Sequence, residues 1–235
     1  MINFILLQVG NKGTEILNET GKVLEQEEIQ LSILSLAYKG GWIMIPLAIL
    51  SIIAVYIFIE RFMVINKATK IDKNFMNNIR DFIHNDKIDT ALALCKSTND
   101  PLTRMIEKGL MRIGKPLTDI NAAIENVGKL EVAKLEKNIA ALATVAGAAP
   151  MIGFLGTVIG MVKAFYDMSM AGNNIDIVLL SSGIYQAMIT TIAGLIVGII
   201  GYICHNILVA RIEKVVFLLE AQATEFMDVL HEPAK

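Results

Sequence analysis

The chain has 235 residues, of which 54% are hydrophobic and 19% are charged, and its mean hydropathy is +0.55. It is too apolar for an ordinary soluble domain and too charged to lie wholly within a membrane. Its net charge of −2 gives no reason to expect nucleic acid as a partner.

Residues 1–39 are expected to form a short, amphipathic and acidic segment outside the membrane. Its first residues, MINFILLQ, lack the basic stretch of a secretory signal peptide, and the apolar run is short. A cleaved signal peptide is therefore not expected.

Three stretches are long and apolar enough to cross a bilayer, which takes about 20 residues. We expect transmembrane helices over residues 40–60, 138–167 and 178–204, with a short outer loop over 168–177. The third stretch carries no Asp, Glu, Lys or Arg from Val178 to Ala210. That length corresponds to roughly 50 Å of helix, so its end is expected to project into water.

The segment over 61–137 is expected to be a helical cytoplasmic domain, because its apolar residues recur at helical spacing. Asp100 and Pro101 predict the start of one of its helices. From Thr118 to Asp167 the pattern shows no break, which predicts a single helix of roughly 75 Å with a kink at Pro150.

The tail over 205–235 is expected to be a cytoplasmic amphipathic helix that packs along this stalk, since Ile212, Val215 and Leu219 share a face. No β pattern of any length occurs. The predicted fold class is an all-α integral membrane protein with three transmembrane helices and long cytoplasmic helical extensions.

Lys and Arg concentrate between the first two spans, which predicts that this loop and the C-terminus face the cytoplasm and the N-terminus the outside. Arg61, Lys134 and Lys137 lie next to the membrane ends. We expect these three side chains to meet lipid phosphate headgroups.

Polar and small residues interrupt the second and third spans. Small residues and one proline predict close helix packing, namely Pro150, Gly153, Gly156 and Gly160 on the second span and Gly194 and Gly198 on the third. Four polar residues, Thr157, Gln186, Thr190 and Thr191, allow two interpretations. Their side chains either bond to helix backbones at packing contacts or line a polar path through the membrane. Either way, Thr and Gln do not titrate near neutral pH, so a proton path would need a protonatable group from another chain.

Two segments resemble one family closely. The sequences NIAALATVAGAAPMIGFLGTVIGMVKAFYDM and SSGIYQAMITTIAGLIVGIIGY are similar to the signature of the ExbB/TolQ/MotA proton-channel subunits. The resemblance implies a ring of five copies around a smaller ExbD-like or TolR-like subunit that carries a membrane aspartate. Proton motive force would act on that aspartate, with the output passed to a TonB-like or TolA-like protein. It also implies that Thr157 and Thr191 stand at the family's threonine positions, whereas Gln186 replaces a frequent glutamate.

The outer segment of about 39 residues resembles ExbB more than TolQ, so we expect an inner-membrane subunit that energises TonB-dependent transport. A TolQ-like role and a non-conducting membrane scaffold remain alternatives. A small-solute transporter is disfavoured, because no internal repeat or pair of broken helices occurs. An enzyme is not expected either, since His84, His205 and His231 are scattered and no metal, cofactor or phosphate-binding spacing appears.

Overall fold

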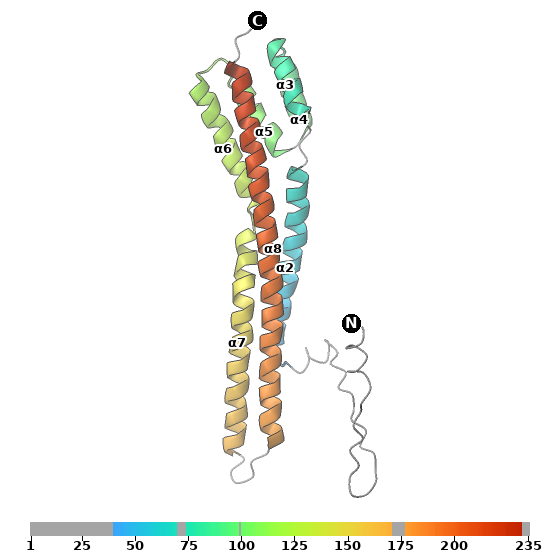
Figure 1. Ribbon diagram of the computed structural model, residues 1–235, viewed down its shortest axis with the longest axis vertical. Helices are drawn as coiled ribbons and strands as arrows, with labels where there is room; N and C mark the ends of the chain where they lie inside the picture. The colour runs from blue at the N-terminus through green and yellow to red at the C-terminus, as the bar shows by residue number, and fades with distance from the viewer. Residues whose placement is uncertain (1–39, 70–73, 99, 171–176, 232–235) are drawn as a thin grey trace, which may run out of the picture. The chain divides into compact units, whose positions relative to one another are not determined.

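The computed structural model describes residues 40–69, 74–98, 100–170 and 177–231, and the regular structure in these ranges is entirely α-helical. In chain order the helices are α2 (Met44–Ala68), α3 (Phe75–His84), α4 (Ile88–Ser97), α5 (Pro101–Leu110), α6 (Leu117–Leu135), α7 (Ile139–Met170) and α8 (Ile177–His231) (Figure 1). All of them belong to one compact unit, Ala37–Lys235. The all-α class is confirmed, while the expected outer segment over 1–39 lies outside the described residues.

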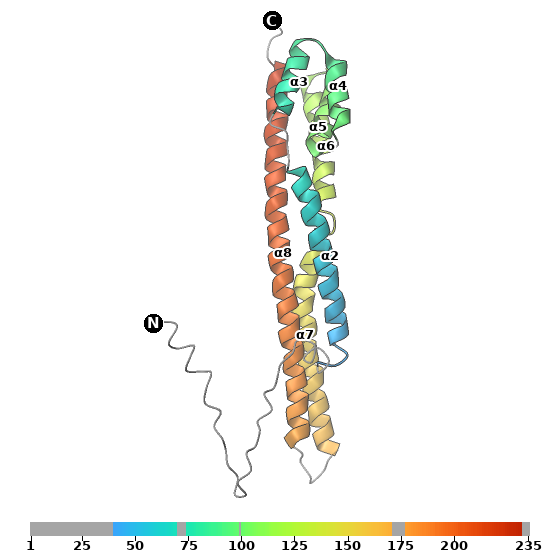
Figure 2. The same ribbon diagram turned by 90° about the vertical axis from the view of Figure 1, so that its right-hand side faces the viewer.

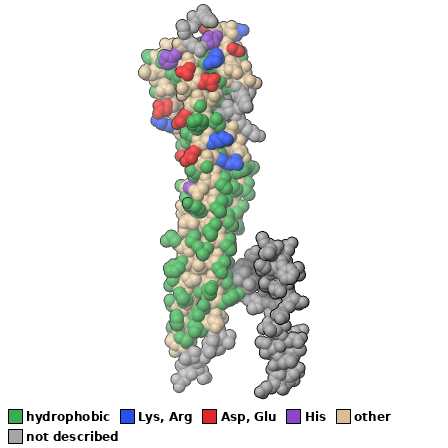
Figure 3. Space-filling model, in the orientation of Figure 1, with side chains coloured by type: hydrophobic (Ala, Val, Ile, Leu, Met, Phe, Trp, Pro, Cys, Tyr) green, Lys and Arg blue, Asp and Glu red, His purple; other side chains and the backbone are tan. Residues whose placement is uncertain are grey.

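Three helical stretches are long and apolar enough to cross a membrane, Met44–Ala68, Leu117–Met170 and Leu180–His231. Figure 3 shows that the charged side chains of the described helices gather toward one end, around α3 to α6. Apolar side chains cover the other end, where α7 and the first half of α8 lie side by side. The chain is therefore built as a multi-pass membrane protein with a water-exposed helical part.

The expected single helix from Thr118 to Asp167 is wrong, because α6 ends at Leu135 and α7 begins at Ile139. Between them Asn138 has a φ of 65°, a left-handed conformation that asparagine tolerates better than most residues. Hydrophobic periodicity cannot detect such a break, since both helices keep their own apolar faces. α7, in contrast, continues through Pro150.

α8 is one helix across both the expected third span and the expected tail. Its C-terminal half buries Leu208, Ile212, Val215, Leu219 and Phe226 in a core shared with α5 and α6. Figures 1 and 2 show α7 beside the first half of α8 and the helices α3 to α6 around its second half. The expected packing of the tail on the stalk is confirmed, and α8 joins the membrane part to the water-exposed part without a break.

Candidate functional site

The backbones of α7 and α8 approach each other where glycines meet. A Cβ atom on Gly194 would lie 2.6 Å from the carbonyl oxygen of Ala149 and 2.8 Å from the Cα atom of Gly153. On Gly156 it would lie 2.4 Å from Oγ1 of Thr190. Only glycine permits such a close approach. In lipid there is little hydrophobic drive between helices, so the van der Waals contacts of this close approach hold the pair together.

All six residues predicted for packing lie along this contact. Gly160 faces Ala187, Gly198 faces Pro150, and Gly153 and Gly156 face the stretch Thr190–Gly194. The glycine stripes are thus used within one chain. The part of each helix that remains available to another chain lies beside the stripes.

The two adjacent threonines of α8 have different surroundings. Thr190 is only 1% exposed, and its hydroxyl donates to the carbonyl oxygen of Ala187 at 2.7 Å within its own helix. Thr191 is half-buried, and its hydroxyl donates across the helix contact to the carbonyl oxygen of Gly153 at 3.1 Å. In a regular α-helix the Gly153 carbonyl also accepts the amide of Thr157. Thr191 therefore lies within one turn of Thr157.

Thr157 is half-buried on α7, and its hydroxyl donates to the carbonyl oxygen of Phe154 at 2.6 Å. The hydroxyls of Thr157 and Thr191 thus each donate a hydrogen bond to a backbone carbonyl. Each hydroxyl oxygen still has a free lone pair that can accept a hydrogen bond. We call Thr157, Thr191 and the Gly153 carbonyl the threonine site.

Gln186 lies apart from the threonine site. Its side-chain nitrogen is so close to Gly41 that a Cβ there would lie 2.2 Å from it, and Gly41 has a φ of 74°. Gln186 and Thr191 are five residues apart, so they point in directions roughly 140° apart on α8. The carboxamide thus packs where α2 begins, and nothing in the sequence pattern indicated that contact.

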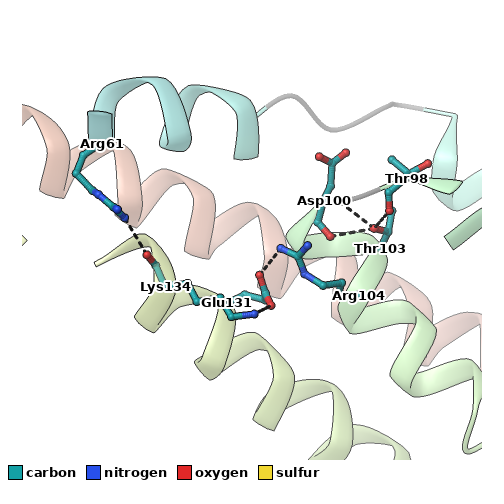
Figure 4. Close-up of polar contacts among 7 residues, drawn as sticks. All are labelled: Arg61, Thr98, Asp100, Thr103, Arg104, Glu131 and Lys134. Atoms are coloured by element: carbon teal, nitrogen blue, oxygen red, sulfur yellow. Dashed lines mark hydrogen bonds and ion pairs between the residues drawn. The ribbon is translucent and has the colours of Figure 1, made fainter. Parts of the chain in front are cut away.

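A second group of polar contacts joins α2 and α5 to the last turns of α6 (Figure 4). Arg61 of α2 is 5% exposed, its Nη1 donates to the carbonyl oxygen of Lys134 at 3.1 Å, and its Nη2 contacts Glu60 at 2.6 Å. A buried cation at the last turn of α6 satisfies a carbonyl that the helix leaves open and complements the helix dipole. The expectation that Arg61 meets lipid headgroups is therefore wrong, because its guanidinium is enclosed by protein.

Glu131 is a buried carboxylate that the sequence analysis did not single out. It is 3% exposed and pairs with Arg104 of α5 at 2.5 Å and with Lys134 at 2.6 Å (Figure 4). Burial raises the pKa of Glu131, but the hydrogen bonds and positive charges of Arg104 and Lys134 outweigh it, so the pKa lies below its ordinary value of 4.5. The pair Glu131–Lys134 was recognisable as an i,i+3 contact, whereas Arg104 was not.

Among the described residues no group of three or more His, Cys, Asp or Glu side chains could hold a metal ion. α7 and α8 instead present hydroxyls and backbone carbonyls in an apolar, tightly packed pair of membrane helices. These groups can accept and orient a proton donor, but they do not carry a proton themselves at neutral pH. The fold and site define a multi-pass helical membrane protein whose second and third spans meet through glycines and threonine hydroxyls.

The comparisons with known proteins agree with this class. A profile of the MotA/TolQ/ExbB proton channel family matches residues 97–221, more than half of the chain. The chain belongs to this family, as an ExbB/TolQ-type membrane subunit.

Three curated relatives illustrate the range of the match. The chain is 25% identical to an ExbB homologue of Methanothermobacter thermautotrophicus, over 80% of this chain and 67% of the relative. It is 32% identical to the Tol-Pal system protein TolQ of Haemophilus influenzae, over 59% of this chain and 56% of TolQ. It is 37% identical to the biopolymer transport protein ExbB of Aquifex aeolicus, over 34% of this chain and 54% of that protein.

Proposed function

We propose that this chain is the wall-forming subunit of an inner-membrane complex driven by the proton motive force, and that the complex energises TonB-dependent transport across the outer membrane. Several copies, five in the family pattern, would surround a small ExbD-like subunit that brings a membrane aspartate. The observation that carries the proposal is the threonine site. It brings Thr157 and Thr191 within one turn of each other around the carbonyl of Gly153.

The chemistry of the threonine site suits a carboxylic acid better than a carboxylate. Both hydroxyls donate to backbone carbonyls, so the oxygens offer lone pairs to an incoming donor. A protonated aspartic acid can donate to such an oxygen without disturbing the wall. An ionised aspartate must first draw a hydroxyl away from its carbonyl, and the hydrogen bond that is lost contributes about 0.5–1.5 kcal/mol. The wall would therefore favour the protonated partner.

The other polar residues of the two helices have supporting roles in this proposal. Thr190 is enclosed between α7 and α8 and serves packing. Gln186 holds the start of α2 and keeps the outer end of the wall closed. The basic side chains that follow α2 and precede α7 support a cytoplasmic location of the helices α3 to α6 and a periplasmic N-terminus.

The decisive experiment is co-expression with the neighbouring gene of the operon, followed by mass measurement of the intact purified complex. We expect several copies of this chain with a small partner whose single span carries an aspartate. The purified complex, placed in liposomes, should conduct protons. A wild-type chain that remains a monomer in mild detergent, or a complex that conducts no protons under a pH gradient, would contradict the proposal.

A TolQ-like role in the Tol-Pal system is the second candidate, because two TolQ proteins are 32% and 31% identical to this chain. The two roles differ in the protein that receives the output. Loss of uptake through TonB-dependent receptors in a deletion strain supports the first role. A defect in envelope integrity with normal uptake supports the second role. A deletion strain that shows neither defect would support the alternative of a non-conducting scaffold.

A further inference from the structure

A cavity with three titratable side chains lies where α7 begins. It has a volume of about 410 Å³ and is formed by the end of α6, the first turn of α7 and the middle of α8. Its titratable lining groups are Glu136, His205 and Glu213. We call this cavity the basal pocket. Neither the threonine site nor the contacts around Arg61 use these three side chains.

The basal pocket lies on the same face of both helices as the threonine site. Ile139 lines the pocket and precedes Thr157 by about five helical turns, while Val209 lines it and follows Thr191 by the same number. A whole number of turns returns a residue to the same side of its helix. The spacing on α7 and the spacing on α8 therefore each place the pocket and the threonine site on one face. The two sites are separated by about 27 Å along the helix axes.

A further polar group lies between them on this face. Tyr202 follows Thr191 by about three turns, and its side chain is 63% exposed. The rest of that stretch is apolar or small, with Pro150 packed against Gly198. Polar groups on the face are therefore concentrated at the threonines, at Tyr202 and in the basal pocket.

The other charged side chains near the pocket either bind partners outside it or are exposed to solvent. On α2, Arg61 binds Glu60 and the Lys134 carbonyl, and on α8, Arg211 stacks on Phe62 and binds Asn66. On α6, Lys134 pairs with Glu131. Lys137 and Lys214 are exposed and do not line the pocket. No described cation lines the pocket to neutralise Glu136 and Glu213, and the imidazole of His205 adds ring nitrogens that can donate or accept a hydrogen bond.

We propose that the basal pocket is the cytoplasmic proton-release site of the wall, and that Glu136, His205 and Glu213 receive the proton that leaves the threonine site. The proposal rests on the proposed function. The partner's carboxylic acid gives its proton to a water molecule on the shared face, and the O–H bond of the acid breaks. The proton then forms a new bond to a pocket carboxylate or to the imidazole, which later releases it to cytoplasmic water and returns to its starting state. Water carries the proton across the apolar stretch, and Tyr202 supplies a hydroxyl along it.

The test compares two triple variants of the full complex in liposomes, with proton flux followed by a pH-sensitive dye. One carries Glu136→Gln, His205→Gln and Glu213→Gln. The matched control carries Glu125→Gln, Glu220→Gln and His231→Gln, which makes the same changes on α6 and α8 at residues that line a different groove. We expect the pocket variant to conduct at least about tenfold more slowly, since positioned acid–base groups accelerate proton transfer by 10²–10⁴. The control should match the wild type.

Three further measurements separate proton transfer from damage to the fold. Flux through the wild type should depend on the pH on the pocket side, and His205→Ala should weaken that dependence, because the variant removes a proton acceptor from the pocket. Added imidazole should restore part of the flux in His205→Ala. Tyr202→Phe, which keeps the ring, should slow flux less than the pocket variant.

Equal flux and an equal pH profile in the pocket and control variants would overturn the inference while leaving the proposed function intact. So would a loss of flux in His205→Ala that imidazole does not restore, because that result points to structure. A wild-type complex without any proton flux is a different outcome and contradicts the proposed function itself.

Discussion

At the scale of single residues, adjacent positions of one helix have different surroundings. Thr190 and Thr191 differ by about 100° in direction on α8, which encloses the first and leaves the second half-buried. The same side-chain type is therefore packed between the helices at Thr190 and belongs to the threonine site at Thr191. A substitution that removes only the hydroxyl separates the two roles.

We expect Thr157→Val and Thr191→Val each to abolish or strongly reduce energy-dependent uptake while the complex still assembles. Valine keeps the shape and removes the oxygen that a partner's acid would use. Thr190→Val is the matched control and should retain most activity. Gln186→Glu should also retain most activity, and Gln186→Leu should lose less activity than either threonine variant. Uptake at the wild-type level in a Thr157→Val, Thr191→Val double variant would show that these hydroxyls serve only their own helices.

Glu131 provides a stability prediction with a defined pH dependence. Glu131→Gln removes a buried charge that receives hydrogen bonds from Arg104 and Lys134. We expect the variant to lose about 1–3 kcal/mol at neutral pH, seen as a lower thermal midpoint in detergent. Because the pKa of Glu131 is lowered from 4.5 in the folded chain, its stabilising effect is fully present above that pH. The effect is lost as the pH falls through the lower, folded-state pKa.

The control for this measurement is Glu125→Gln. Glu125 and its partner Lys129 are both exposed, with side chains 58% and 70% accessible. A surface pair of this kind contributes little to stability, so the thermal midpoint should stay unchanged. A wild-type advantage over Glu131→Gln that stays constant as the pH is lowered stepwise from 4.5 until the wild type unfolds would contradict the assignment of the charge.

At the scale of the elements, the contact between α7 and α8 depends on glycine where backbones meet. We expect Gly194→Ala to force the two helices apart, because its Cβ would collide with backbone atoms of Ala149 and Gly153 that cannot move aside. Overpacking of this kind costs about 1–3 kcal/mol and should weaken the bond from Thr191 to the Gly153 carbonyl. Gly160→Leu, which meets Ala187, should act in the same way within one chain.

Gly147→Ala is the control, since Gly147 lies on α7, the other helix of the pair, and its Cβ would meet no atom within 4 Å. Thermal midpoints of the purified complex and the distance between spin labels on α7 and α8 measure the effect. Equal stability and equal distances for Gly194→Ala and Gly147→Ala would show that the close approach is not needed.

Near the junction of α6 and α7, side chains of α2 contact both α6 and α8. Arg61 reaches the last turn of α6, while Phe62 and Asn66 meet Arg211 of α8. The end of α2 is therefore tied both to the end of α6 and to α8. On the other side of the helix break at Glu136–Asn138, Ile139 and Leu142 of α7 are buried in the core shared with α8.

At the scale of the whole molecule, the orientation in the membrane can be measured with single cysteines. In a Cys204→Ala background, we expect Met170→Cys to react with an impermeant maleimide in spheroplasts, and Lys137→Cys only after lysis. Both positions are exposed. Cys95 can stay in place, because burial and the nearby charge of Glu107 raise its pKa to about 11 and suppress the reactive thiolate. Labelling in the reverse order would contradict a cytoplasmic location of α3 to α6.

The sequence by itself determined the class of the protein. Length and apolar character identify membrane helices because burial in lipid depends on composition more than on partners. The motifs around Thr157 and Thr191 indicated the family, and the profile match confirmed it. Asp100 and Pro101 predicted the start of α5 correctly, since a capping box is a local arrangement of neighbouring residues.

Only the tertiary structure decided which neighbour each polar group meets. Arg61 looks like a headgroup ligand in the sequence, yet it caps α6, because α2 packs against a helix more than seventy residues away. Glu131 and Arg104 come together across two helices, and Gln186 meets Gly41 across a distance that no local pattern encodes. The break at Asn138 is equally invisible to periodicity, because it changes the direction of the backbone and leaves the apolar spacing on either side intact. Contacts between distant segments depend on how whole helices pack, and that packing is set by the sum of many weak interactions along their lengths.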